Sequence, residues 1–435
     1  MSFLDRRRAA ALSGLTVRGR SFLAAGIATA GCAVVLGQQD LLRVSFLLLS
    51  LPLGCATVLG RVRYRLALAR VVSPCRVETG GTARVNLELE NLSPRTVRIL
   101  LAEDRVPYSL GPAPRFLLPR LSGGQRATVS YPLCAERRGR YPVGPLRLRL
   151  TDPFGMCEIT RSFTAVDPLM VVPRVCPLLP LTAGGAREGT GESTSRALTT
   201  TGEDDVSIRE YRNGDDLRRV HWRSTARRGQ LMVRQEEQSR HVRATVLLDV
   251  RAGAHSGDGV CGSFEWAVTA TASVVAHLLE QQYAVRLLTD GRPAPWNPPS
   301  EGAGRVVDEL AVLRTGPDES LARAADAVTR EDGRQVLVAV LGRPDRESVC
   351  LLGAPGTLAR TGIAVLLQTD RWGASGQEDA GQAGEGRAAA AELRVRGWTV
   401  VEAGPDDRIA QVWERAVLGN ASRSSLPTGH ATGRR

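Results

Sequence analysis

Two uncharged apolar runs near the N-terminus constrain the fold of this chain more than any other feature. They are residues 21–39, SFLAAGIATAGCAVVLGQQ, and residues 44–60, VSFLLLSLPLGCATVLG. Each is close to the roughly 20 residues that a helix needs to cross the hydrocarbon layer of a bilayer. The connection at 38–43 is long enough only for a tight turn. The sequence therefore predicts a transmembrane helix pair over residues 21–60. The alternative is a buried helical hairpin within a soluble domain.

The charges around this pair predict its orientation. Arginines lie outside both ends of the pair: Arg6, Arg7, Arg8, Arg18, Arg20, Arg61, Arg63, Arg65 and Arg70. Segments rich in Lys and Arg stay in the cytoplasm. We therefore predict a cytoplasmic N-terminal tail at 1–20, two spans through the lipid bilayer of the cell membrane, and a cytoplasmic C-terminus. The eight cysteines are scattered singly, which predicts neither a disulfide framework nor a zinc site.

A strand-rich pattern follows the second run. Apolar and polar residues alternate in ARVNLELENL (83–92), QRATVSYPL (125–133) and PLRLRL (145–150), and Gly- and Pro-rich clusters separate these segments. Short segments with a period of two are typical of an antiparallel sandwich. We therefore predict a β-sandwich module over 70–175. It is expected to act as a spacer, because His, Cys and carboxylates do not cluster in it.

The next part of the chain is strongly polar. Residues 182–203 are small and polar, which predicts a flexible loop; the alternative is a loop whose hydroxyl groups close on a ligand. Residues 204–240 form an arginine-rich signature segment. Within it, residues 209–229, REYRNGDDLRRVHWRSTARRG, have the chain's highest density of polar recognition groups.

A helix is expected within the signature segment, beginning after Asp215 and ending at Gly229. Arg219 and Arg223 are four residues apart, and such like-charge pairs cost about 0.2–0.5 kcal/mol in an isolated helix. Trp222 lies on the same charged side. We therefore expect this side to face acidic groups that also cover the indole. Internal carboxylates, an acidic partner surface or a bound phosphate would each serve, and a clasp by internal carboxylates is our first interpretation.

The candidate partner-binding residues are the polar and aromatic side chains of this segment: Arg209, Glu210, Tyr211, Asp215, Asp216, Arg218, His221, Trp222, Arg223 and Arg227. His221 is expected on the apolar face of the helix, where a histidine is more often a core residue than a base. The sequence HWRS does not match a nucleophile motif. We therefore predict no catalytic residues. The alternative is an enzyme with an anion-binding site around Arg218 and His221.

Residues 241–418 predict a third domain. Apolar strands alternate with helices there, and this pattern is typical of a doubly wound parallel sheet. Such sheets bind ligands at the carboxyl ends of their strands, where the first strand ends at Asp249. Low complexity at 371–390 predicts a flexible insertion, and residues 419–435 are expected to be a disordered tail.

The order of these parts resembles the bacterial membrane-anchored proteins grouped as domain of unknown function 58, in their actinobacterial form. The resemblance rests on RRGRY…GP…DPFG, on REYRNGDDLRRVHWRSTARRGQLMVRQEE at 209–237, and on LLDVRAG at the start of the third domain. It covers most of residues 136–345. Asn213 stands where the family usually has proline. Such proteins are commonly encoded beside MoxR-type AAA+ ATPases, so the resemblance implies a partner of that kind.

The resemblance also implies that the third domain is similar to von Willebrand factor A domains. Those domains often bind Mg²⁺ through D-x-S-x-S on the first strand. Here the corresponding residues are Asp249, Val250, Arg251, Ala252 and Gly253, so both serines are missing and Arg251 brings a positive charge. Because Mg²⁺ needs several oxygen ligands, we expect a degenerate, vacant site at Asp249. No cofactor is predicted.

Together these features predict a membrane-anchored cytoplasmic scaffold or adaptor that binds a protein partner, with the AAA+ ATPase implied by the resemblance. A second alternative is nucleic-acid binding through the arginine-rich helix. The net charge of +12 is consistent with it. The lone Trp222 provides little of the aromatic stacking that single strands require, so we expect no nucleic acid.

Overall fold

The computed structural model describes residues 14–424 with internal gaps. The gaps are 62–64, 95, 98–99, 153, 182–205, 211–221, 237–241, 290–293, 318–320, 330–334, 354–360 and 373–379. The chain divides into two units, Met1–Pro173 with Ala311–Leu313, and Arg174–Leu310 with Arg314–Arg435. The loop predicted at 182–203 and most of the tail predicted at 1–20 lie outside the described residues.

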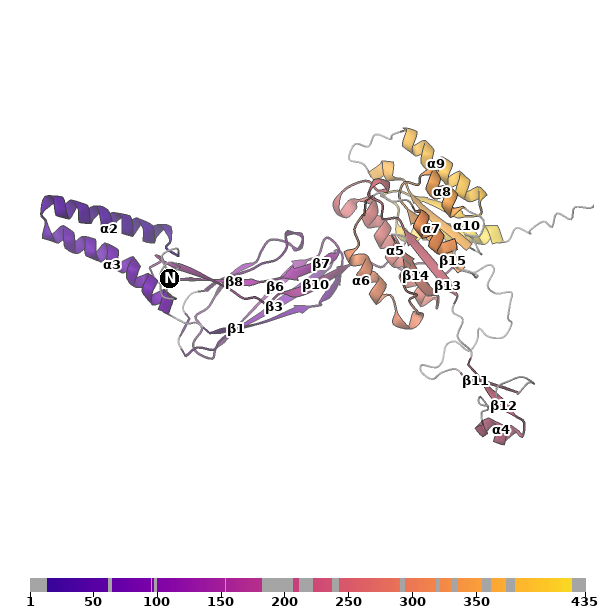
Figure 1. Ribbon diagram of the computed structural model, residues 1–435, viewed down its shortest axis with the longest axis horizontal. Coiled ribbons are helices and arrows are strands. Elements are labelled where there is room, and N and C mark those ends of the chain that lie inside the picture. Colours follow the sequence, from indigo (N-terminus) through magenta and orange to yellow (C-terminus); the bar gives the residue numbers. More distant parts are fainter. Residues whose placement is uncertain are drawn as a thin grey trace, which may run out of the picture. The chain divides into compact units, whose positions relative to one another are not determined.

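Two N-terminal helices confirm the predicted helix pair (Figure 1). They are α2, Val17–Leu36, and α3, Gln39–Arg61. Thr16 caps α2 by accepting a hydrogen bond from the Gly19 amide at 3.3 Å. Both helices are long and apolar enough to cross a membrane. Both also begin earlier than predicted, because the N-cap and the short Gly37–Gln38 turn, rather than the edges of the apolar runs, define their starts.

The rest of the first unit is strand-rich. Its strands are β1 Leu66–Ser73, β2 Arg76–Glu78, β3 Thr82–Asn91, β4 Leu100–Asp104, β5 Arg115–Leu118, β6 Arg126–Cys134, β7 Gly139–Val143, β8 Leu146–Thr151, β9 Glu158–Ser162 and β10 Asp167–Val172. They form three sheets, β1-β3-β6, β2-β10-β7 and β5-β4-β8-β9.

One core unites these three sheets. Alternate residues of β3, namely Val85, Leu87 and Leu89, are buried, and they share one apolar cluster with Leu148 of β8 and Leu169 of β10. The prediction of a strand-rich module is therefore confirmed. The prediction that it is entirely antiparallel is wrong, because β2 pairs with β10 in parallel. The two strands lie near the beginning and the end of the module, and this long connection permits a parallel pair.

The second unit contains the predicted parallel sheet. Its strands are β13 Arg243–Leu248, β14 Ala284–Leu288, β15 Gln335–Leu341, β16 Thr361–Leu367 and β17 Thr399–Ala403. They lie in the order β14-β13-β15-β16-β17, and every neighbouring pair is parallel. The helices are α5 Ser263–Glu280, α6 Gly304–Val312, α7 Ala322–Thr329, α8 Arg346–Leu352, α9 Ala380–Val395 and α10 Ile409–Ser424.

Helices cover both faces of this sheet (Figure 1). Leu247 and Leu337 share a buried cluster with Val349 of α8 and Leu393 of α9. Helix α5 packs on β13, β14 and β15, and it meets α10, where the rings of His277 and Trp413 are 6.1 Å apart. Adjacent strand residues point to opposite faces, so the sheet is wound on both sides.

Two predicted boundaries of this domain are wrong. Helix α9 occupies part of the insertion predicted at 371–390, because the alanines around Ala390 favour a helix and bury that residue with Leu393 completely. Helix α10 continues to Ser424, past the predicted domain end at 418. Residues 425–435 of the predicted tail lie outside the described residues.

Candidate functional site

The carboxyl end of β13 is the first candidate site. The chain crosses from β13 to β14 on one side of it and then to β15 on the other side. Such a reversal of strand order is where open α/β sheets usually bind ligands. Residues Ala244–Leu248 are buried, and the strand delivers Asp249 to this point with none of its side chain exposed. A buried carboxylate requires a partner.

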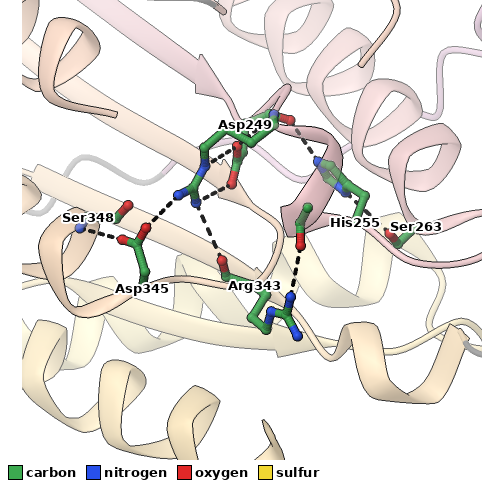
Figure 2. Close-up of polar contacts among 8 residues, drawn as sticks. Asp249, His255, Ser263, Arg343, Asp345 and Ser348 are labelled. Carbon is green, nitrogen blue, oxygen red and sulfur yellow. Dashed lines mark hydrogen bonds and ion pairs between the residues drawn. The ribbon is translucent and has the colours of Figure 1, made fainter. Parts of the chain in front are cut away.

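Arg251 supplies that partner (Figure 2). Its Nε donates to Asp249 Oδ1 at 3.0 Å, and its Nη2 donates to Asp249 Oδ2 at 2.9 Å. Its Nη1 donates to Asp345 Oδ2 at 2.8 Å. The second oxygen of Asp345 accepts from the Ser348 amide at 2.6 Å, which caps α8. The guanidinium of Arg251 therefore lies between the two carboxylates.

The charges in this cluster reinforce one another. Burial alone would lower the pKa of Arg251, but the hydrogen bonds and charge of Asp249 and the charge of Asp345 raise it. Burial would raise the pKa of Asp345, but hydrogen bonds from Ser348 and the charge of Arg251 lower it. Arg251 and Asp345 are thus stabilised in their charged forms. The positive charge predicted for this position from the sequence is observed there, and it engages both oxygens of Asp249. Among the described residues, no group of three or more His, Cys, Asp or Glu side chains could hold a metal ion.

His255 holds the loop that follows β13. Its Nε2 lies 2.8 Å from the Asp249 carbonyl oxygen, so it donates to that oxygen, and its Nδ1 lies 3.2 Å from Ser263 Oγ (Figure 2). Both ring nitrogens are therefore used in the neutral form of the ring. Burial lowers the pKa of His255, as does the charge of Arg251. The ring therefore bridges the backbone at the end of β13 and the Ser263 side chain at the start of α5.

The stability of the second unit should depend on pH through these histidines. Burial lowers the pKa of His255 and also that of His277 on α5. In the unfolded chain each protonates at about pH 6.5, whereas the folded state resists protonation. Their contribution to stability is therefore present above about pH 6.5 and is lost as the pH falls below it. Urea unfolding followed by tryptophan fluorescence should show this loss, and H255N should make it smaller. An unchanged pH profile in H255N would contradict the assignment.

A cavity adjoins the cluster at the same edge of the sheet. It has a volume of about 270 Å³, and charged side chains of both signs line it: Arg343, Asp370, Arg371, Arg387 and Glu402. Glu402 has a partner there, since it accepts from Gln368 at 3.1 Å. Arg371 in turn donates to Gln368 and Asp406. Part of the lining is therefore a network of paired polar groups, formed by Gln368, Arg371 and Glu402.

The arginine-rich signature segment is the second candidate site. It contains a hairpin of β11, Val206–Glu210, and β12, Met232–Glu236, with α4, Trp222–Arg228, between them. The predicted end of the helix is confirmed, because Gly229 follows α4 with a φ of 70°. The amide of Met232 donates to Thr225 Oγ1 at 3.0 Å, which ties α4 to β12. Arg209 and Glu210 lie in β11. The other predicted residues before Trp222, namely Tyr211, Asp215, Asp216, Arg218 and His221, lie outside the described residues.

The candidate partner-binding side chains of α4 are exposed. Trp222 is 70% exposed, and Arg223 and Arg227 are exposed as well. Most of the carboxylates near α4 in the sequence lie outside the described residues, so the clasp by internal carboxylates stays a prediction. The helix is short and packs on β12.

The sequence pattern does not identify every member of the first site. Asp345 lies 94 residues from Arg251, and only the sheet topology brings them together. A local signal was nevertheless present, because an Asp directly before a helix is typical of an N-cap. His255 has no such signal, since a single histidine in a Gly-rich loop indicates nothing about its partners.

Sequence comparison finds a family match that contains the described hairpin of the signature segment and part of the first site, without Asp345. Residues 207–343 match the family model "Protein of unknown function DUF58". The DUF58 match begins in β11 and ends after β15, so it includes α4, Asp249 and Arg251. The uncharacterized protein YeaD of Bacillus subtilis (strain 168) is 25% identical over 241 residues, which are 54% of this chain and 58% of that protein. The chain therefore spans little more than half the length of this curated relative.

Solved structures offer weaker likenesses. One is the CARDB domain of PF1109 from Pyrococcus furiosus, described in complex with di-metal ions. It shares 12% identity and covers 26% of this chain and 96% of its own, with a TM-score of 0.19. Another is the ApaA protein from Bordetella pertussis, at 10% identity over 25% of this chain and 94% of its own, with a TM-score of 0.20. Likenesses at this level carry no argument about this chain.

Proposed function

We propose that this protein is a membrane-anchored cytoplasmic scaffold or adaptor that binds a protein partner. The observation that carries the proposal is the exposed indole of Trp222 on an arginine-rich helix. Trp and Arg are the side chains that most often dominate the energy of protein interfaces. A large aromatic group left in water on such a helix supports binding to a second protein with an acidic surface. The resemblance to domain of unknown function 58 suggests a MoxR-type AAA+ ATPase.

The membrane anchorage in this proposal is supported by the helix pair. Many apolar side chains of α2 and α3 are exposed, among them Val35 at 85% and Phe46 at 74%. A hairpin inside a soluble domain would bury these groups, whereas a lipid bilayer would cover them. The flanking arginines support cytoplasmic positions for both termini.

The contacts of the first candidate site support a role in binding a protein partner rather than in metal chemistry. We propose that this chain has the actinobacterial form of domain of unknown function 58, and that its second unit is a von Willebrand factor A-like domain in which Arg251 takes the place of a cation. Its guanidinium already engages both oxygens of Asp249 and one of Asp345. A fixed internal cation would keep this edge of the sheet rigid. Rigid elements present binding surfaces better than mobile ones do.

Replacing Trp222 with alanine should weaken the proposed partnership. Truncation of a central interface tryptophan typically costs about 2 kcal/mol or more, which is roughly a thirtyfold or greater loss of affinity. We expect W222A, purified from detergent-solubilised membranes, to recover at least about tenfold less AAA+ ATPase than the unaltered chain. Quantitative mass spectrometry of the co-purified proteins measures this.

The matched control is V395A, which removes a side chain that is 88% exposed at the end of α9. It should leave recovery of the ATPase unchanged. Equal recovery with W222A and V395A would contradict a role for α4. Failure of the unaltered chain to recover any AAA+ ATPase would contradict this partner.

A further inference from the structure

The turn between β8 and β9 has a fixed shape. Asp152 organises it, because its Oδ2 accepts from the Phe154 amide at 3.1 Å and its Oδ1 accepts from the Cys157 amide at 2.6 Å. Gly155 has a φ of 69°, a conformation that glycine adopts without strain. Since Asp152 is buried, the turn is held from within, and among its described residues Phe154 has an exposed ring.

This turn is bonded to the start of the first apolar helix. The Thr16 amide donates to the Met156 carbonyl oxygen at 2.9 Å, and Thr16 Oγ1 donates to that of Gly155 at 2.6 Å. An apolar cluster closes the junction, formed by Leu15, Ala56, Met156 and Cys157 with Phe22, Leu23, Leu51, Cys55 and Ile159 packed against it. The turn therefore lies at the level of the N-cap and first turns of α2.

The position of this turn along α2 indicates its depth in a bilayer. A lipid contact at the turn rests on the proposed membrane anchorage. Helix α2 has 20 residues, which at 1.5 Å per residue is about 30 Å long. The hydrocarbon core of a bilayer is also about 30 Å thick. One end of α2 must then lie at each boundary of the core. The end at Val17 carries the turn with it, to the headgroup level of the leaflet.

The surface of the strand-rich module at this level suits a lipid interface. Phe154 is 58% exposed and Leu92 is 57% exposed. The Leu92 amide donates to the carbonyl oxygen of Arg65 at 2.8 Å, four residues after α3 ends, so Leu92 also belongs to this end. Arg18 is close to the turn, since a Cβ on Gly155 would lie 3.7 Å from its Nη1.

The physical chemistry of these side chains favours an anionic membrane surface. Moving an exposed Phe or Leu side chain out of water is favourable in proportion to the apolar area that is covered. An arginine near an anionic leaflet adds an electrostatic attraction. The Phe154 ring is largely uncovered within the described chain, although it lies beside a buried apolar cluster. A bilayer that surrounds α2 at this height would cover it.

We infer that the Phe154 turn is a lipid-binding element. The Phe154 ring inserts into the interface of the bilayer that α2 and α3 cross, with Arg18 beside it at the anionic headgroups. The strand-rich module is then held on the membrane surface by this contact as well as by its covalent connection to α3. It is more than a spacer, because the bonds from Thr16 to the turn fix its angle to the helices.

A tryptophan at position 154 tests this contact. All six native tryptophans lie at or after Trp222, so F154W adds one to a unit that has none. The full-length variant is reconstituted in vesicles of phosphatidylcholine and phosphatidylglycerol, with and without bromine atoms near the glycerol end of the acyl chains. We expect brominated lipid to quench most of the emission that F154W adds to that of the unaltered chain.

Y108W is the matched control. Tyr108 is 95% exposed and follows β4, whose end at Asp104 pairs with Leu146, the residue of β8 farthest from the turn. Its added emission should not be quenched. L92W provides a second probe at the near end and should behave as F154W does.

The outcomes separate the two proposals. Protein that floats with the vesicles but shows no quenching at positions 154 and 92 overturns the lipid contact and leaves the anchorage intact. Protein that does not float with vesicles overturns both. Quenching at 154 and 92 without quenching at 108 supports the inference.

Discussion

Replacing Arg70 with methionine is expected to lower the free energy of unfolding of the first unit by about 3–5 kcal/mol. The side chain of Arg70 is 1% exposed and that of Asp104 is not exposed at all, and Arg70 Nη2 donates to Asp104 Oδ1 at 2.8 Å. Arg70 Nη1 also donates to the carbonyl oxygens of Val143 and Ala165. Without the guanidinium, Asp104 would remain as a buried charge whose desolvation is not compensated.

The remaining partner of Asp104 cannot replace the arginine. Tyr131 Oη donates to Asp104 Oδ2 at 2.6 Å. Burial, followed by the hydrogen bond to Asp104, raises the pKa of Tyr131, so the phenol stays protonated and brings no positive charge. The carboxylate in R70M would therefore gain a proton or draw in water, and either response costs stability.

Hydrogen exchange of β3 and β6, measured by mass spectrometry in urea, reports the unfolding of the first unit separately from that of the second. The control is R115M, which removes an exposed ion pair with Glu103 at 3.1 Å, in which the arginine side chain is 66% exposed. Exposed pairs contribute about 0–1 kcal/mol, so R115M should change little. Equal effects of R70M and R115M would contradict a stabilising role for the buried pair, which joins β1 and β4 of two different sheets.

The sequence predicts this molecule well where a signal is local and poorly where it depends on packing. The apolar runs predict α2 and α3, and apolar strands between helices predict the parallel sheet, because periodicity reports burial directly. The ion pair of Arg70 joins residues 34 apart, and no local pattern specifies it. At 371–390 the composition is misleading, because glycines suggest a loop while Ala390 and Leu393 bury one side of a helix.

The two candidate sites show the same division. Arg251 next to Asp249 could be predicted, since the two residues are close along the chain. The environment of Trp222 could not be predicted in this way, because it depends on which groups surround α4. A physical preference for covering an indole does not say whether the cover comes from this chain or from a partner.

The second large effect is expected from replacement of Arg251 with alanine. Asp249 has no exposed side-chain surface, and Arg251 is the side chain that neutralises it. Its removal leaves a buried carboxylate, so R251A should lower the free energy of unfolding of the second unit by about 3–5 kcal/mol. Tryptophan fluorescence in urea measures this unit selectively, because every tryptophan lies at or after Trp222.

A double variant separates the charge from the lost packing. D249N in the R251A background removes the orphaned charge, so it should regain much of the loss. The exposed pair of Arg305 and Glu301, 3.3 Å apart on neighbouring turns, provides the control, and R305A should cost less than about 0.5 kcal/mol. No recovery in the double variant would mean that Arg251 stabilises the unit by packing alone.

The same variant asks whether the guanidinium stands in for a metal ion. In R251A the oxygens of Asp249 and Asp345 face the space that Arg251 occupied, and one or two carboxylates with water can bind Mg²⁺. We therefore expect Mg²⁺ to raise the unfolding midpoint of R251A and to leave that of the unaltered chain unchanged. Comparing the two proteins is informative because Mg²⁺ raises the unfolding midpoint of a protein only if it binds the folded state more tightly than the unfolded state. If Mg²⁺ acts equally on both proteins, the arginine does not occupy a cation position, and the case for a rigid docking domain built around an internal cation is lost.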